Sequence, residues 1–348
     1  MNNCSGCGHN IRIPKGAGTL HLKFPTLHTK AKALSFLESA NIKLAEKGDL
    51  IAIEVQEEGL LSIVDLLDDP FTKIEANGIK AYFEEKERES VFADVFEVRP
   101  LSTFVALIQS QWLSELIDSK SYTTYFQPIV DCMSPDNVLG YECLFRGLRG
   151  ESLLSPADIF ETAKSAEITP KIDLAARQSA IECAVQSHIG GKLFINFAPT
   201  AIYDPVNCLA TTIALLEENQ IQPERVCFEI VETEKIADVA DLVTLCNFYR
   251  MRGFNIVLDD LGAGYSSLTL ITQLKPGYVK IDMELIRDVD TDSFKASYTK
   301  ALIDAAKRVD VQVICEGVET DGEYQWLREH GADYVQGFYF ARPSATGQ

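Results

Sequence analysis

The fold is decided by the stretch Ile256-Val257-Leu258-Asp259-Asp260-Leu261-Gly262-Ala263-Gly264-Tyr265-Ser266-Ser267-Leu268, in which an apolar run typical of a strand ends in two carboxylates and a glycine-rich loop. Because neighbouring side chains of a strand point to opposite faces, both acids can serve one site only if the strand stops between them and the backbone turns. Gly262 and Gly264 permit such a turn, since glycine adopts positive φ without steric cost. Alone, the stretch could equally be an acidic surface turn. Seven other places in the chain, however, repeat the pattern of an apolar strand-like run that carries a polar residue at or near its end.

Those places lie beyond residue 118, where short apolar strands alternate with longer helical stretches, as in β/α architectures. The predicted strands are Tyr125–Val130, Leu139–Phe145, Leu193–Phe197, Val226–Val231, Asn255–Asp259, Tyr278–Ile281, Val311–Cys315 and Tyr334–Gly337. Eight strands indicate a TIM-type barrel. The link from Asp131 to Val138 is too short for a parallel crossover of about a dozen residues. The predicted fold class is therefore α/β, a modified TIM (β/α)8 barrel with an antiparallel first strand.

The N-terminal part of the chain predicts a separate small α+β domain. Residues 1–99 contain two alternating runs, Thr19–Phe24 and Leu50–Val55, with an amphipathic helix over Ala31–Leu44 between them. Helical spacing of apolar residues continues over Leu101–Ile117. We therefore expect a regulatory or sensory module of unknown type in residues 1–99, a linker helix in 100–118 and a catalytic barrel in 119–348.

The chain opens with Cys4-Ser5-Gly6-Cys7, which is half of a zinc knuckle by spacing. A second Cys-x-x-Cys is missing from the sequence, so metal binding there would need His21, His28 or another subunit. The other interpretation is a disordered tail with two idle thiols.

Composition excludes several classes of function. The 348-residue chain has a formal net charge of -19, so general binding to nucleic acid or to anionic membranes is not expected. No apolar stretch reaches membrane-spanning length, and the first residues lack the features of a signal peptide. Nine scattered cysteines are typical of reduced thiols, which together with these features predicts a cytoplasmic protein.

Each predicted barrel strand carries a polar residue at or near the same end. In order these are Gln127, Glu142, Asn196, Glu229, Asp259 with Asp260, Lys280, Glu316 and Gln336. Five carboxylates at one mouth would repel one another unless cations neutralised them. The set contains oxygen donors but no histidine or cysteine, which favours Mg²⁺ or Mn²⁺ over Zn²⁺.

Adjacent acids such as Asp259 and Asp260 suit a bridged pair of metal ions, which can clamp both oxygens of an in-line displacement at phosphorus. Lys280 could then position or deprotonate the attacking water, and Arg146 could hold a phosphate oxygen. This chemistry predicts metal-dependent hydrolysis of a phosphodiester. Ca²⁺ should inhibit, because it is larger and takes more ligands at longer distances.

The ordered motifs resemble those of the EAL-domain family. They are Tyr141-Glu142-Cys143-Leu144-Phe145-Arg146-Gly147, Ile195-Asn196-Phe197-Ala198-Pro199, Phe228-Glu229-Ile230-Val231-Glu232, the loop Asp259–Leu268, Lys280-Ile281-Asp282, Cys315-Glu316-Gly317-Val318-Glu319-Thr320 and Val335-Gln336-Gly337-Phe338. The resemblance covers roughly residues 119–345 and seven motifs in order. It implies hydrolysis of cyclic di-GMP to linear pGpG, with two Mg²⁺ or Mn²⁺ ions, in a homodimer formed through the barrel.

The resemblance also implies roles for single residues. The metal ligands would be Glu142, Asn196, Glu229, Asp259, Asp260 and Glu316. The catalytic group would comprise Lys280, Glu142, Gln336 and Glu232, the last anchoring the loop over Asp260–Leu268. The substrate contacts would be Gln127, Leu144, Arg146 and Asp282, with Glu319 behind the metal ligands.

The chain departs from the family pattern at four positions, none of which removes a ligand. Cys143 replaces alanine, Val231 replaces threonine, and Leu261 and Ala263 replace phenylalanine and threonine. The loss of the hydroxyl at Val231 puts the rigidity of the metal loop in question. The complete diguanylate cyclase signature that often accompanies the family is absent from the sequence.

Three functions remain open at this point. The first is an active cyclic di-GMP phosphodiesterase, favoured because every ligand and the lysine are present. The second is a catalytically silent cyclic di-GMP receptor that signals through the N-terminal module. The third is another metal-dependent barrel, such as an aldolase or an enolase-like enzyme, which would explain the carboxylates but not the ordered motifs.

Overall fold

The computed structural model describes residues 12–57, 59–86, 97–150, 152–198, 205–231, 239–262 and 267–347. Contacts between Cα atoms divide these residues into two compact units. The barrel unit contains residues 121–156 and the chain from 170 onward, and the N-terminal unit contains the chain up to 120 together with 157–169. The division of the chain into module, linker helix and barrel near residue 118 remains our proposal.

The barrel unit is built on one nine-stranded sheet whose order is β6-β14-β13-β12-β11-β10-β9-β7-β8. Its strands are β6 (Tyr122–Asp131), β7 (Val138–Arg149), β8 (Ser152–Leu154), β9 (Lys192–Asn196), β10 (Val226–Val231), β11 (Asn255–Leu261), β12 (Tyr278–Ile281), β13 (Gln312–Cys315) and β14 (Tyr334–Val335). An additional pairing of β6 with β7 closes the sheet into a barrel and leaves β8 outside it.

The first strand runs against the rest of the barrel. β6 pairs in antiparallel fashion with both β7 and β14, whereas the pairings from β7 through β9 to β14 are all parallel. The predicted modified barrel is therefore confirmed. The short connection between Asp131 and Val138 permits only a hairpin, and the hairpin fixes the direction of β6.

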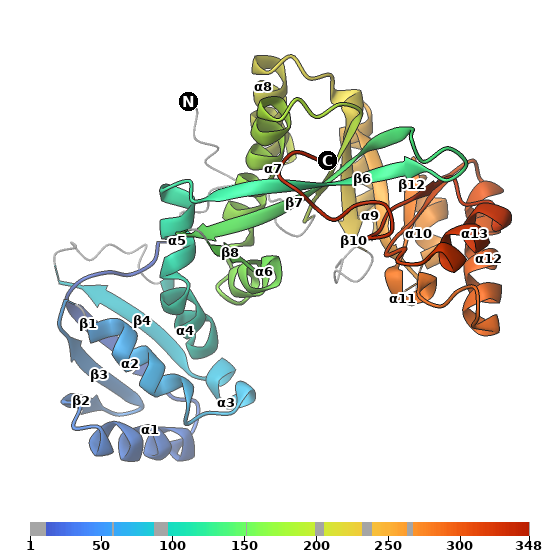
Figure 1. Cartoon of the computed structure of the whole chain (residues 1–348). Coiled ribbons are helices and arrows are strands. Elements are labelled where there is room, and N and C mark those ends of the chain that lie inside the picture. Colours follow the sequence, from blue (N-terminus) through green and yellow to red (C-terminus); the bar gives the residue numbers. More distant parts are fainter. Residues whose placement is uncertain are drawn as a thin grey trace. The chain divides into compact units, whose positions relative to one another are not determined.

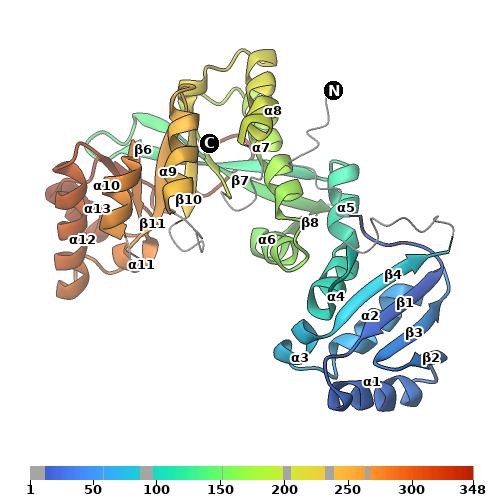
Figure 2. The same cartoon turned by 180° about the vertical axis from the view of Figure 1, so that it is seen from behind.

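Helices cover the outside of the barrel strands, as Figures 1 and 2 show. They are α7 (Thr169–Gln186), α8 (Pro205–Glu218), η3 (Pro223–Arg225), α9 (Val239–Arg250), α10 (Ser267–Leu274), α11 (Met283–Ile286), α12 (Ser293–Lys307) and α13 (Asp321–His330). Their apolar side chains form one buried cluster with outward-facing strand residues, including Phe228 and Val279. This layer holds the strands in register.

A second, smaller cluster fills the inside of the barrel. Its buried members are Ile129, Phe194, Cys227, Val257, Tyr278 and Ile314. They come from six different strands, so the interior is a packed plug rather than a channel. This plug forms the floor on which the polar residues of the barrel lie.

The N-terminal unit is a ferredoxin-like βαββαβ arrangement with sheet order β2-β3-β1-β4-β5. Its elements are β1 (Gly18–Lys23), α1 (Leu27–Ser39), β2 (Leu44–Lys47), β3 (Leu50–Val55), α2 (Gly59–Asp68), α3 (Lys73–Gly78), β4 (Lys80–Glu85), β5 (Arg99–Pro100), α4 (Leu101–Gln109), α5 (Gln111–Asp118) and α6 (Pro156–Ser165). Alternate residues of the central strands, such as Leu20 and Ile53, are fully buried. A small α+β N-terminal domain is therefore confirmed.

Three details of this unit differ from expectation. The first helix spans Leu27–Ser39 rather than Ala31–Leu44, because Thr26 caps it and Leu44 already begins β2. The single helix predicted over Leu101–Ile117 is two helices, which meet at Ser110. The pair Cys4 and Cys7 lies outside the described residues. In the described part of the chain, no helix is long and apolar enough to cross a membrane.

Candidate active site

The polar residues of the barrel form a layer directly above the apolar plug. Side chains on one face of a strand recur every second residue, so the residue two positions beyond a plug residue points the same way. The plug residues Phe194, Cys227, Val257, Tyr278 and Ile314 are followed two positions later by Asn196, Glu229, Asp259, Lys280 and Glu316. Strand periodicity therefore gathers the predicted polar set into one ring.

Two predicted residues reach this layer by a different route. Gln127 and Glu142 lie within β6 and β7 rather than at their carboxyl ends, because the hairpin strands are longer than predicted. They are direct partners in the antiparallel register. Since β6 runs in reverse, Gln127 precedes its plug residue Ile129 by two positions instead of following it.

Lys280 lies at the centre of the ring and is only 1% exposed. Its Nζ is 2.5 Å from an oxygen of Glu316 and 2.9 Å from one of Glu229. Asp259 and Glu142 lie further away, at 3.5 and 3.7 Å from the same nitrogen. Burial lowers the pKa of the ammonium, but the surrounding carboxylates outweigh burial and hold that pKa well above its usual range.

One ammonium cannot neutralise all of these acids, and the pKa values of two of them are raised. Burial raises the pKa of Glu316 to about 8, with Asp259 and Glu142 adding to the effect and Lys280 opposing it. Burial likewise raises the pKa of Glu229 well above its usual range. The ring therefore takes up either protons or further cations.

Glu229 is paired with Lys280 through one oxygen only, and its second oxygen has no partner among the described residues. It is fully buried, and within the described part of the chain neither oxygen accepts a hydrogen bond of good geometry, although Oε1 lies close to Lys280. A buried carboxylate oxygen without a donor is unfavourable unless a cation approaches it. Asn196 lies beside Glu229 in the parallel register of β9 and β10. These two oxygen donors fit a hard divalent cation.

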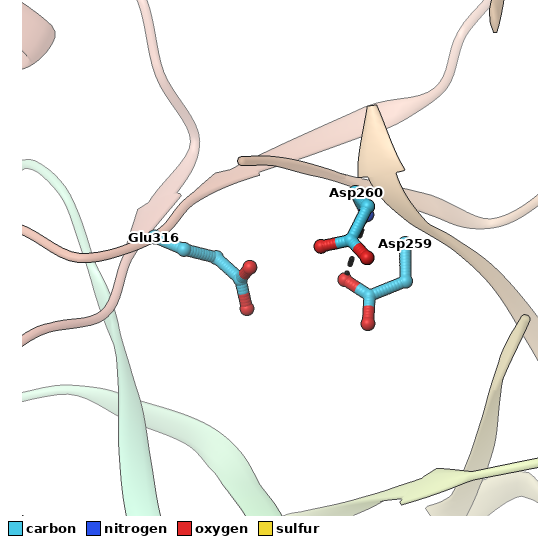
Figure 3. A group of neighbouring side chains, drawn as sticks. All are labelled: Asp259, Asp260 and Glu316. Atoms are coloured by element: carbon cyan, nitrogen blue, oxygen red, sulfur yellow. Dashed lines mark hydrogen bonds between the residues drawn. The ribbon is translucent and has the colours of Figure 1, made fainter. Parts of the chain in front are cut away.

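A second group of oxygen donors lies at the end of β11. Ligand atoms of Asp259, Asp260 and Glu316 all fall within 4.8 Å of one another, and Figure 3 shows the carboxyl groups turned toward a common space. The donor set and its spacing fit Mg²⁺ or Mn²⁺. The residues predicted to hold metal thus include two neighbouring sets of oxygen donors that share the ring.

The backbone brings Asp259 and Asp260 together in an unexpected way. The strand does not stop between them, because β11 continues to Leu261 with a register irregularity after Leu258. Asp260 itself adopts a left-handed conformation with φ 56°, and its N–H donates to Asp259 Oδ1 at 3.0 Å. The turn that we attributed to Gly262 and Gly264 therefore begins earlier, at Asp260, whose backbone is strained. Burial, Asp259 and Asp282 raise the pKa of Asp260 to about 6.

A chain of amide contacts links the first and last barrel strands. Gln336 Nε2 donates to Glu142 Oε2 at 2.6 Å and to Gln127 Oε1 at 3.1 Å. Gln127 Nε2 in turn donates to the carbonyl of Ala341 at 3.1 Å. Gln336 is buried and its own Oε1 has no partner among the described residues. The amides hold Glu142 in place, and one buried acceptor stays unpaired among the described residues.

The family follows from comparison of the whole barrel with known proteins. The model of the EAL domain matches residues 110–343, which is more than half of the chain. The chain belongs to the EAL domain family.

Two curated relatives and one solved structure show what this EAL chain is similar to. The probable cyclic di-GMP phosphodiesterase PdeB of Escherichia coli K12 is 28% identical over 66% of this chain and 44% of its own length. The blue light- and temperature-regulated antirepressor BluF of the same strain is 26% identical over 64% of this chain and 54% of its own. The chain therefore spans about half the length of these relatives.

The solved structure is a standalone versatile EAL protein from Vibrio cholerae O395 in its cyclic di-GMP bound form. It is 35% identical, has a TM-score of 0.58, and covers 64% of this chain and 92% of its own.

Two of the residues assigned to substrate by resemblance, Leu144 and Arg146, lie on β7 beyond Glu142. Arg146 is half-buried and lies over the ring of Tyr125, 5.7 Å from its centroid. Burial lowers the pKa of its guanidinium. Leu144 lies opposite Tyr125 in the register of β6 and β7, two residues along from Glu142. The rim of the hairpin thus presents an aromatic ring, a cation and an apolar side chain.

The other assigned positions have structural partners. Asp282 caps α11 by accepting from Glu284 N at 2.8 Å, and Glu319 forms an ion pair of 2.9 Å with Arg287. Glu232 and the loop residues 263–266 lie outside the described residues. The roles assigned to Asp282, Glu319 and Glu232 remain proposals.

Sequence reasoning missed a buried ion pair between Asp173 and Arg177 on α7. Two opposite charges four residues apart on a helix are common on surfaces, so the spacing gives no warning of burial. The available signal was their position within a run of apolar helix residues.

Proposed function

We propose that this chain is a metal-dependent phosphodiesterase that cleaves one diester bond of cyclic di-GMP to give linear pGpG. The observation that carries the proposal is the ring of carboxylates around the buried Lys280 at the mouth of an EAL barrel. The naming of PdeB as a probable phosphodiesterase and the cyclic di-GMP bound form of the Vibrio structure support the substrate.

The proposed metal ligands are Glu142, Asn196, Glu229, Asp259, Asp260 and Glu316. Two Mg²⁺ or Mn²⁺ ions bound there would offset the charge of the diester and lower the pKa of a water. Ca²⁺ is proposed to inhibit, because its longer ligand distances would spread the donors.

The chain's own residues provide orientation and charge. Lys280 would donate hydrogen bonds to the attacking water or to a phosphate oxygen, since it is held at the centre of the ring by ion pairs. Gln336 and Gln127 would orient the water through their amides, and Arg146 would hold a non-bridging phosphate oxygen. Charge-assisted hydrogen bonds of this kind gain strength at a half-buried site.

The direct test is to incubate the purified protein with cyclic di-GMP and Mg²⁺ or Mn²⁺ and to resolve the nucleotides by chromatography. We expect linear pGpG as the first product, no reaction in EDTA, and inhibition by Ca²⁺. Intact substrate after prolonged incubation with metal would contradict the proposed activity.

A second candidate function is a cyclic di-GMP receptor without turnover. Its support is that one relative, BluF, is described as an antirepressor rather than as an enzyme. Calorimetric binding of cyclic di-GMP together with the absence of pGpG would favour this alternative. Because the proposed ligands and Lys280 are all present, we place hydrolysis first.

Regulation is proposed to come from the N-terminal unit and from a homodimer formed through the barrel. All the proposed ligands lie in the barrel unit, so the N-terminal unit would set the rate without contributing chemistry. We propose a cytoplasmic location, where its nucleotide substrate would be available.

A further inference from the structure

An ion pair outside the ring reaches the segment that follows β9. Arg177 Nη2 lies 3.0 Å from Asp173 Oδ2, and both side chains are at most 5% exposed. The other oxygen, Asp173 Oδ1, accepts from the backbone N–H of Ala198 at 3.1 Å. Ala198 is two residues beyond Asn196, so a helix side chain holds the backbone just after a proposed metal ligand.

Further contacts fix the end of β9, and the hydrogen bond from Ala198 N to Asp173 is the last of them along the described chain. Phe197 N donates to the carbonyl of Glu229 at 3.0 Å, which keeps β9 beside β10. The Phe197 ring packs against Phe228 and Tyr249, each 5.2 Å away between centroids. Beyond Phe197 the regular ladder has ended, and Asp173 takes over the last described N–H before residue 199.

The pair has a third partner that fixes its own geometry. Arg177 Nη1 donates to the hydroxyl of Thr212 on α8 at 3.1 Å, and Thr212 is buried as well. The guanidinium therefore bridges α7 and α8, while the carboxylate reaches to the strand end. Two helices and the segment after β9 meet at one ion pair.

Stability alone is a poor reason for such a pair. Burying two charges is unfavourable, and replacing a buried pair by apolar residues of similar volume is often neutral or stabilising. What apolar residues cannot replace is the acceptor for Ala198 N. This contrast separates a structural role from a positioning role.

We propose that Asp173 is a positioning residue that holds the end of β9 so that Asn196 stays beside Glu229 as a metal ligand, while Arg177 supplies its buried counter-charge. The inference rests on the proposed function for the role of Asn196. It predicts that metal affinity depends on the Asp173 acceptor even where folding does not. Residues that orient ligands from behind typically change metal affinity or activity by about 10- to 100-fold.

Two variants separate the possibilities in the full-length chain. In Asp173→Leu/Arg177→Met the charges are removed together, so folding should be retained while the acceptor for Ala198 N is lost. In Arg177→Met alone the acceptor remains, but the carboxylate is left buried without its partner, so Tm should fall. The matched control is Asp304→Asn, in the exposed i,i+4 pair that Asp304 forms with Lys300 on α12.

The readouts are Tm, Mn²⁺ affinity measured by calorimetry and by the spin-resonance signal of free Mn²⁺, and kcat and KM for cyclic di-GMP. We expect the double variant to keep Tm near that of the parent, to bind Mn²⁺ about tenfold more weakly, and to lose kcat at low metal but recover it at high Mn²⁺. Arg177→Met should have a lower Tm than the parent but retain its Mn²⁺ affinity within about twofold. The control Asp304→Asn should change neither Tm nor Mn²⁺ affinity.

A folded double variant with parental Mn²⁺ affinity would overturn the positioning role. If the double variant does not fold, a tenfold loss of Mn²⁺ affinity in folded Arg177→Met, which keeps the acceptor, would overturn it instead. Failure of the proposed function is distinguishable from failure of this proposal. Mn²⁺ affinity can be compared between the parent and both variants even if none of them hydrolyses cyclic di-GMP.

Discussion

At the scale of single residues, Lys280 is both a proposed catalytic residue and the counter-charge of the ring. It is the only cation in direct contact with four of the acids among the described residues, and its removal would leave buried carboxylates without a counter-charge. Metal ions could supply that charge in its place. The proposed catalysis and the stability of the metal-free protein are therefore linked through one side chain.

Lys280→Met should lower kcat by several orders of magnitude and change KM little, since the lysine acts on the water and on the charge that develops in the transition state. It should also lower Tm in EDTA more than in Mg²⁺, because unpaired buried charge is strongly destabilising. Steady-state kinetics and thermal unfolding with and without metal check both effects. A variant with weakened binding and unchanged kcat would show that the role is misassigned.

The raised pKa values of the acids give a second prediction at this scale. In the folded metal-free protein the pKa is about 8 for Glu316 against a usual 4.5, and about 6 for Asp260 against 3.8. The folded state therefore binds more protons than the unfolded state in this range, so stability present below about pH 4 is lost as the pH rises to about 8.

Thermal unfolding in EDTA at several pH values should show Tm falling over this interval. Added Mg²⁺ should reverse the fall most strongly at the alkaline end, because metal binds the deprotonated carboxylates. A metal-free Tm that rises steadily from pH 5 to pH 8 would contradict the assigned directions.

Asp260 combines a proposed ligand with a strained backbone, at φ 56°. Asp260→Gly removes the carboxylate and also the steric cost of this conformation, so its Tm should equal or exceed that of the parent. Asp260→Ala removes the carboxylate but keeps the cost, so it should be less stable than the glycine variant by about 1 kcal/mol. Both should lose metal-dependent turnover.

Denaturant unfolding of the two variants, with metal titration alongside, checks this prediction. Equal stability of the two variants would mean that the left-handed conformation is not retained in solution.

At the scale of elements, the β6–β7 hairpin both closes the barrel and contributes Gln127 and Glu142. Gly140 lies where β7 meets β9, and a Cβ at this position would approach the carbonyl oxygen of Lys192 to 2.3 Å. The strands can pair at this junction only because no side chain intervenes. The close approach requires glycine for reasons of space rather than of φ.

Gly140→Ala should therefore destabilise the barrel by about 1–3 kcal/mol, the usual range for overpacking against groups that cannot move. Gly190→Ala is the matched control, since a Cβ there meets nothing within 4 Å. Denaturant midpoints for the two variants provide the measurement. Equal midpoints would show that the junction tolerates a side chain.

At the scale of the whole molecule, the boundary between units determines how the chain can be divided. The buried face of α4, which includes Phe104 and Ile108, belongs to the N-terminal compact unit. α6 also belongs to that unit, although its residues follow β8 in sequence.

Deleting residues 1–99 should leave the apolar face of α4 exposed and cause association, whereas deleting 1–120 should give a better-behaved barrel. Both should bind metal and form the same product, with an altered kcat if the N-terminal unit sets the rate. Size-exclusion chromatography and kinetics of the two truncations provide the check. Loss of metal binding would place the boundary elsewhere, and an unchanged rate would deny the unit a regulatory role.

The sequence by itself determined the barrel, its antiparallel first strand and the set of polar residues in the ring. These follow from local rules: strand periodicity places Glu229 and Lys280 two residues beyond the plug, and a short link between the first strands forces a hairpin. The motif order was enough to indicate the EAL family, which the comparison confirmed.

Only the tertiary structure decided how the ring is charged and held. The left-handed Asp260 lies where the register between β11 and β12 shifts, and this register depends on how two separate segments pair. The burial of Lys280 and of the Asp173–Arg177 pair depends on helices and strands packing around them, and sequence spacing carries no measure of such distances. Local patterns fix which face a residue lies on, whereas its charge environment is set by neighbours that the fold brings from elsewhere in the chain.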